Sequence, residues 1–142
     1  MKWTLLFFFL LLTTPIWACT CMEIQVEMDS SIIKSGSYET YLGTIVSRKR
    51  IKRNDRKFYV FRVRINQKYT LQTDRKYIKL ITPTQSSACG FPFKIGRKYL
   101  ITNGIDFTRN GIRRTSICLR NVLKKEATYD IKLIEAILNE DK

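Results

Sequence analysis

The chain has 142 residues, of which 26 are lysine or arginine and 12 are aspartate or glutamate, so its formal net charge is +14. It contains no histidine, which excludes Ser-His-Asp and Cys-His catalysis and zinc sites that need histidine ligands. The length favours a single domain, and the strong positive charge favours anionic partners. The sequence shows no paired-carboxylate motif either, so we do not expect an enzyme.

The first 18 residues have the pattern of a secretory signal peptide. Lys2 gives a positive start, residues 5–12 are an apolar core, and Ala18 is a small residue at the cleavage position. The apolar run is far short of the roughly 20 residues that cross a bilayer as a helix. We therefore expect cleavage after Ala18, which leaves a secreted domain of residues 19–142 with a formal charge of +13 and no membrane span. The alternatives are an uncleaved anchor and a bacterial lipoprotein signal that would lipidate Cys19.

The remaining chain predicts several short strands and two helices. Asp29 and Gly36 can cap the two ends of a short helix. Apolar, β-branched and aromatic patterns predict five strands, at residues 38–47, 57–65, 76–82, 98–102 and 115–122. Turns are predicted at Asn103-Gly104 and Asn110-Gly111. Apolar residues at helical spacing predict a C-terminal helix at 128–138 that packs on the core. This layout indicates a small β-barrel.

The four cysteines are Cys19, Cys21, Cys89 and Cys118, and an even number in an exported chain predicts disulfides. A bridge between Cys19 and Cys21 would close a strained ring. Both other pairings tie the N-terminal segment to two distant segments, and the spacing alone does not choose between them. A zinc site made of the four cysteines is a less favoured alternative, because structural zinc modules use paired Cys-x-x-Cys spacing.

In chain order these features resemble the netrin-like domain of the tissue inhibitors of metalloproteinases, the TIMP family. The matching motifs are Cys19-Thr20-Cys21 after the cleavage site, Ser87-Ala88-Cys89-Gly90, the segment GRKYLI at 96–101, and Cys118. They extend over nearly the whole of residues 19–142. The resemblance implies one mainly β domain, a five-stranded OB-fold-like barrel with flanking helices, stapled by disulfides Cys19–Cys89 and Cys21–Cys118. The family's usual third bridge has no counterpart, because residues 22–33 contain no cysteine.

The resemblance also implies a function, the inhibition of matrix-metalloproteinase-like zinc proteases outside the cell. In that family the mature N-terminus fills the protease cleft, and the amine and carbonyl of its first residue displace the zinc-bound water. That residue would be Cys19, so the only metal involved would be the protease's zinc, and the chain would need no cofactor of its own. Thr20 would enter the pocket beside the metal. The further contacts implied in the cleft are Cys21, Met22, Ser87, Ala88 and Cys89.

Residues 47–57, SRKRIKRNDRK, form a strongly basic stretch in which Asp55 is the single acid. We expect this stretch to form the tip of a hairpin. The simplest interpretation of its charge is a solvated loop with no binding partner. The charge also suggests an alternative function, a non-inhibitory netrin-like module that binds glycosaminoglycans such as heparan sulfate, or an anionic cell surface. The candidate residues are Arg48, Lys49, Arg50, Lys52, Arg53, Arg56 and Lys57, which Arg62, Arg64, Lys76 and Lys79 would extend if they share a face. We expect a monomer and no nucleic-acid partner.

Overall fold

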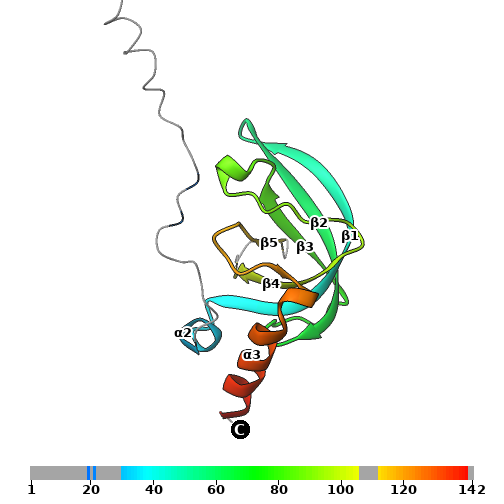
Figure 1. The fold of residues 1–142 in the computed structure, drawn as a ribbon. Coiled ribbons are helices and arrows are strands. Elements are labelled where there is room, and N and C mark those ends of the chain that lie inside the picture. Colours follow the sequence, from blue (N-terminus) through cyan, green and yellow to red (C-terminus); the bar gives the residue numbers. More distant parts are fainter. Residues whose placement is uncertain (1–18, 20, 22–29, 106–111, 141–142) are drawn as a thin grey trace, which may run out of the picture.

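The computed structural model describes residues 19, 21, 30–105 and 112–140 (Figure 1). The elements in chain order are α2 (Ser30–Lys34), β1 (Tyr38–Arg53), β2 (Arg56–Lys68), β3 (Tyr77–Pro83), the 3-10 helix η1 (Ser86–Ala88), β4 (Lys98–Gly104), β5 (Ile112–Arg114), β6 (Val122–Leu123), the 3-10 helix η2 (Lys124–Glu126) and α3 (Thr128–Glu140). The predictions for residues 1–18, Thr20, Met22, Asp29 and Asn110-Gly111 lie outside the described residues. Within those residues, the structure contains no helix long and apolar enough to cross a membrane.

Five strands form a ring. The strand order is β1-β2-β3-β5-β4, and β4 pairs back with β1. Every pairing in the ring is antiparallel except the one between β3 and β5, which is parallel. The two-residue strand β6 pairs with Tyr99 and Leu100 of β4, on the edge of β4 opposite β1. The protein is therefore a mainly β, five-stranded OB-fold-like barrel with flanking helices, and the predicted fold class is confirmed.

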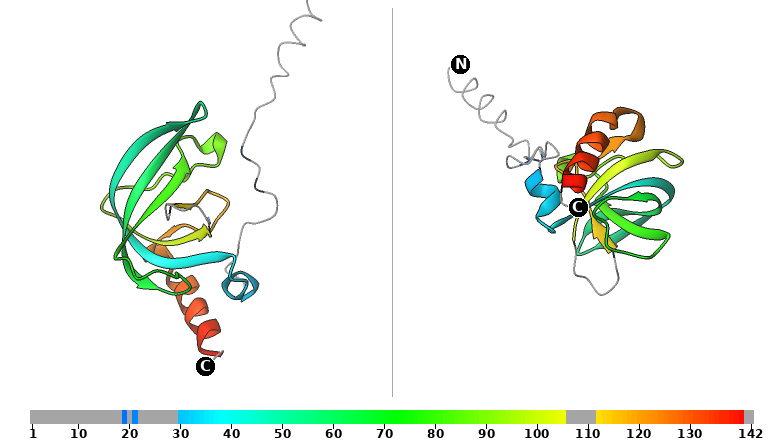
Figure 2. Two further views of the ribbon diagram at one scale, coloured as in Figure 1. Left: turned by 180° about the vertical axis from the view of Figure 1, so that it is seen from behind. Right: turned by 90° about the horizontal axis from the view of Figure 1, so that it is seen from below.

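The core has two parts. Inside the barrel, alternate residues of β2 such as Phe61 and Val63 are fully buried, while Arg62 and Arg64 between them are exposed. This is the period-two pattern of a strand with one face in the core. Outside the barrel, the apolar stripe of α3 packs with α2 and the outer side of β1 and β4 in a second cluster. Figure 2 shows α2 and α3 together at one end of the barrel, so the predicted core-packing role of the C-terminal helix is confirmed.

The predicted strand at 115–122 is wrong. Pairing stops at Arg114 and resumes only at Val122, and the chain between them forms a turn that contains Cys118. The buried Asn121 organises this turn, because its Nδ2 donates to Thr115 Oγ1 at 2.8 Å and to the carbonyls of Ser116 and Leu119 at 3.0 and 3.2 Å. For the carbonyls of Ser116 and Leu119, an amide side chain therefore takes the place of a strand partner.

The predicted turn at Asn103-Gly104 is also wrong, because both residues belong to β4. Asn103 is fully buried and donates through Nδ2 to Glu39 at 3.1 Å. The Glu39 carboxylate also forms a buried ion pair with Arg113 of β5. A residue type that usually marks turns therefore completes the hydrogen bonds of a buried charge that connects β1, β4 and β5.

The basic stretch at 47–57 is not a loop. β1 and β2 remain paired as far as Arg53 and Arg56, and only Asn54 and Asp55 make the turn. Both turn residues have positive φ values, 45° and 60°, as a two-residue hairpin turn that follows the strand twist requires. The basic residues therefore lie on two strands of a hairpin arm that extends beyond the part of β1 that pairs with β4 (Figure 1).

Candidate functional site

Two disulfides attach the N-terminal segment to one edge of the barrel. Cys19 is bridged to Cys89, which follows η1, and Cys21 is bridged to Cys118, which lies in the turn after β5. The Cα atoms of the two pairs are 5.2 and 5.4 Å apart, within the usual range for a disulfide. This is the pairing that the resemblance implies. All four sulfurs are bridged, so they are not the thiolates that a four-cysteine zinc site would need.

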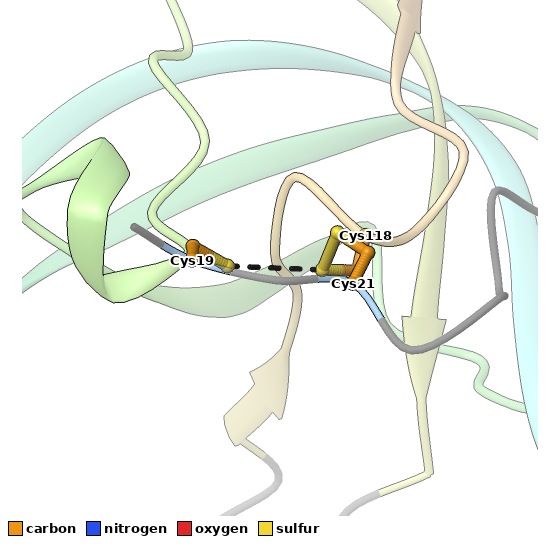
Figure 3. Close-up of side chains that lie close together, drawn as sticks. All are labelled: Cys19, Cys21 and Cys118. Carbon is orange, nitrogen blue, oxygen red and sulfur yellow. Dashed lines mark hydrogen bonds between the residues drawn. A yellow bond between two sulfur atoms is a disulfide. The ribbon is translucent and has the colours of Figure 1, made fainter. Parts of the chain in front are cut away.

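The two bridges lie side by side. The Sγ atoms of Cys19 and Cys118 are 3.9 Å apart, and the dashed line in Figure 3 marks this contact. Neither sulfur carries a hydrogen, because both are in disulfides, so the contact is van der Waals packing between sulfur atoms. Cys19 and Cys21 are thus both held within a small area.

The first loop at this edge contains η1. The amides of Ala88 and Gly90 both donate to the carbonyl of Gln85, at 3.1 and 2.9 Å, and Cys89 donates to Ser86 at 2.9 Å. Cys89 has a φ of 65°, a left-handed conformation that turns the chain back toward the sheet. Gly90 then passes so close to Pro83 that a Cβ atom would collide with the carbonyl oxygen of Pro83. These contacts fix the position of the half-cystine that holds Cys19.

The side chains of η1 point away from the protein. Ser86, Ser87 and Ala88 are all exposed, although the loop backbone is hydrogen-bonded internally. The edge next to Cys19 therefore presents small side chains on a constrained backbone. The sequence places Ser87 and Ala88 in the contact set, and the structure brings both to the same edge as Cys19, Cys21 and Cys89.

The second loop adds a residue that the sequence does not reveal. Ile117 donates its amide to the carbonyl of Cys89 at 3.0 Å, which joins the two loops directly. Its side chain is 39% exposed, so an apolar group faces solvent directly beside a half-cystine. The sequence does not predict this exposure, because Ile117 lies in the segment predicted as a strand, where an isoleucine is expected to face the core.

The basic residues from Arg48 to Lys57 do not belong to this edge as a group. They lie along the β1–β2 arm, all are exposed, and they are divided between the two faces of the hairpin. One contact connects the arm to the first loop, because Thr84, two residues before η1, donates its amide to the carbonyl of Lys57 at 3.1 Å. The arm is thus a separate, charged surface beside the uncharged disulfide edge.

Comparison with known proteins gives no family for this chain: no protein-family model matches the sequence, and no curated protein matches it significantly. Its function is therefore inferred from its own residues and their arrangement.

Proposed function

We propose that the protein is a secreted inhibitor of zinc metalloproteases, similar in action to the TIMP family, and that Cys19 is its first residue after signal-peptide cleavage. The observation that supports this most is the double attachment of the N-terminal segment. Cys19 and Cys21 are bridged to two separate loops at one edge of the barrel, and those loops are themselves hydrogen-bonded to each other.

The chemistry follows from a free N-terminus at Cys19. An α-amine is partly neutral near physiological pH, and with the carbonyl oxygen of the same residue it can close a five-membered chelate on a metal ion. A catalytic zinc keeps one position for water or substrate, and the chelate would take that position. Thr20 would then point into the pocket next to the zinc, and Cys21 and Met22 would continue along the cleft.

The disulfide edge would supply the rest of the contact. Ser87 and Ala88 are small and exposed, so they allow a constrained backbone to approach the wall of a cleft, and Cys89 holds them next to Cys19. Ile117 would cover an apolar part of the protease. Because the bridges order the segment before binding, little conformational entropy is left to oppose the complex.

The direct test compares two forms of the protein that differ by one residue. The first begins at Cys19, as checked by mass spectrometry, and the second carries one additional alanine before Cys19. We expect the first form to inhibit a matrix-metalloproteinase catalytic domain and the second to lose at least about a hundredfold in affinity, equivalent to about 2.7 kcal/mol. Equal inhibition by the two correctly folded forms would exclude chelation by the terminal amine.

A further inference from the structure

The register of the first three strands assigns their basic residues to faces. Residues directly opposite each other in a sheet point to the same side. Phe61 and Val63 of β2 point into the core, so Arg62 and Arg64 point outward. The cross-strand partners of outward residues on β2 also point outward, and this adds cations on β1 and β3. The outward cations, all of them exposed, are Lys49, Arg53, Arg56, Arg62, Arg64 and Lys79. We call these six residues the cationic face.

Two pairs in the cationic face place like charges directly opposite each other. Arg53 is the cross-strand partner of Arg56, and Arg62 is the partner of Lys79. Such pairs destabilise a sheet when nothing neutralises them. At the described outward positions of β1 from 47 to 53, of β2 from 56 to 64 and of β3 there is no aspartate or glutamate. An anion bound between the members of a pair would relieve this repulsion.

The cations follow a line and do not converge on a pocket. From Arg56 to Arg64 the outward positions extend eight residues along β2, which is about 26 Å at the rise of a strand. Cations also lie on both neighbouring strands, Lys49 and Arg53 on β1 and Lys79 on β3. A surface of this shape fits a long ligand with repeated anionic groups better than it fits a single small anion.

We propose that the cationic face binds a linear sulfated polysaccharide. Two aromatic residues occupy outward positions, Phe58 and Tyr77, and neither is fully exposed, which favours sulfate esters over single-stranded nucleic acid. The guanidinium of Arg62 lies over the ring of Tyr77, 4.3 Å from its centroid, so this face of the ring is not available to stack on a base. Single-stranded nucleic acids rely on such stacking, whereas sulfate groups need only charge and hydrogen-bond donors. This binding site is independent of the proposed protease inhibition.

The other face of the same hairpin arm provides a matched control. Arg48, Arg50, Lys52 and Lys57 point to the inner side, since Arg50 is the cross-strand partner of Tyr59, which packs against the core. Two of these cations already have partners within the arm. Arg48 lies over the ring of Tyr59 at 4.6 Å, and Lys52 forms an ion pair with Asp55 at 2.8 Å.

The experiment compares two variants with the same loss of charge, both made from the full coding sequence in a secreting host. In the outer variant Lys49, Arg53, Arg56 and Arg62 are each changed to Gln, and in the inner variant Arg48, Arg50, Lys52 and Lys57 are each changed to Gln. Binding of a heparin oligosaccharide is measured over a series of salt concentrations. We expect the outer variant to bind at least about tenfold more weakly, with a shallower salt dependence, and the inner variant to stay within about threefold of the parent protein.

Equal weakening by the two variants would overturn the proposal, because it would show a response to net charge alone. So would unchanged binding by the outer variant, equal affinity for hyaluronan, which carries carboxylates but no sulfates, or tighter binding of a single-stranded oligonucleotide than of heparin. If the fourfold outer variant fails to fold, the pair Arg62→Gln and Lys79→Gln is compared with Arg50→Gln and Lys52→Gln. The form with an additional alanine before Cys19 should keep full heparin affinity, which separates this site from the proposed inhibition.

Discussion

The Sγ atom of Cys19 lies 3.9 Å from the Sγ atom of Cys118, although the two residues belong to different disulfides. The bridges therefore act on one short segment, and each also constrains the unfolded chain, since its cysteines are 70 and 97 residues apart in the sequence. Stability and the position of Cys19 depend on the same small group of atoms.

Removal of the second bridge tests this dependence. The double variant Cys21→Ser, Cys118→Ser keeps the bridge that holds Cys19 itself. We expect the free energy of unfolding to fall by about 2–5 kcal/mol, as is typical when a native bridge is lost. Inhibition should also weaken, because Cys21 is no longer held at the disulfide edge before binding. Urea unfolding without reductant measures the first effect, and an unchanged midpoint would contradict it.

Gly90 should be required for the shape of the loop that holds Cys89. In Gly90→Ala the new Cβ would collide with the carbonyl of Pro83 and lie 2.8 Å from that of Gln85, and backbone atoms cannot move aside cheaply. We expect a loss of about 1–3 kcal/mol in unfolding free energy, together with weaker inhibition as η1 shifts. Gly104→Ala is the control, because a Cβ there meets no atom of the described residues within 4 Å. Similar melting temperatures for the two variants would contradict the prediction.

Ile117 is expected to contribute to binding without contributing much to stability. Ile117→Ser removes an apolar side chain that is already 39% exposed, so the unfolding free energy should change by less than about 0.5 kcal/mol. If the side chain becomes buried against a protease, the inhibition constant should rise about tenfold, or about 1.4 kcal/mol. Ile95→Ser, at an isoleucine that is 56% exposed in the turn before β4, is the matched control. Equal effects of the two changes on inhibition would remove Ile117 from the contact surface.

The sequence predicts those parts of the molecule in which one face is buried. β2 alternates because Phe61 and Val63 face the core, and α3 shows helical spacing because Ile134 and Ile137 face the second cluster. The end of the hairpin arm near its turn has no such pattern, since cations occupy both of its faces. Local charge alone does not distinguish a strand from a loop. The turn around Cys118 could not be predicted either, because it depends on hydrogen bonds from Asn121 and on a bridge to Cys21, both of which form only in the folded chain.

Tyr41 predicts how stability responds to alkaline pH. Its side chain is fully buried, and its hydroxyl has no hydrogen-bond partner among the described residues. Burial raises the pKa of this phenol well above its usual range, with smaller opposing effects from the charges of Arg113, which lowers it, and Glu39, which raises it. The folded state therefore holds a proton that the unfolded state releases above its ordinary pKa of about 10. The contribution of this proton to stability is fully present below that pH. The unfolding free energy falls as the pH rises above it, by about 1.4 kcal/mol per pH unit.

Tyr41→Phe should remove this contribution. At neutral pH the variant should be as stable as the parent protein or more stable by up to about 1 kcal/mol, because an unpaired buried hydroxyl is lost. Between pH 9 and pH 11.5, the unfolding free energy of the variant should fall less steeply with pH than that of the parent protein. The difference in slope should approach that of one proton, about 1.4 kcal/mol per pH unit. Tyr129→Phe, at a tyrosine that is 76% exposed, controls for ordinary tyrosine titration. A parallel pH dependence of parent and Tyr41→Phe in urea unfolding would contradict the assignment.

The two-residue turn at Asn54 and Asp55 determines how the arm can change in length. Side chains alternate along a strand, so a single inserted or deleted residue in one strand would move the residues beyond it to the opposite face and separate the cations that now lie together. Matched insertions of two residues in each strand would keep every existing side chain on its present face and lengthen the arm by about 6.6 Å. Variation in arm length between related chains is therefore expected in even steps, and each step would add one more row to the charged surface without any change in the barrel.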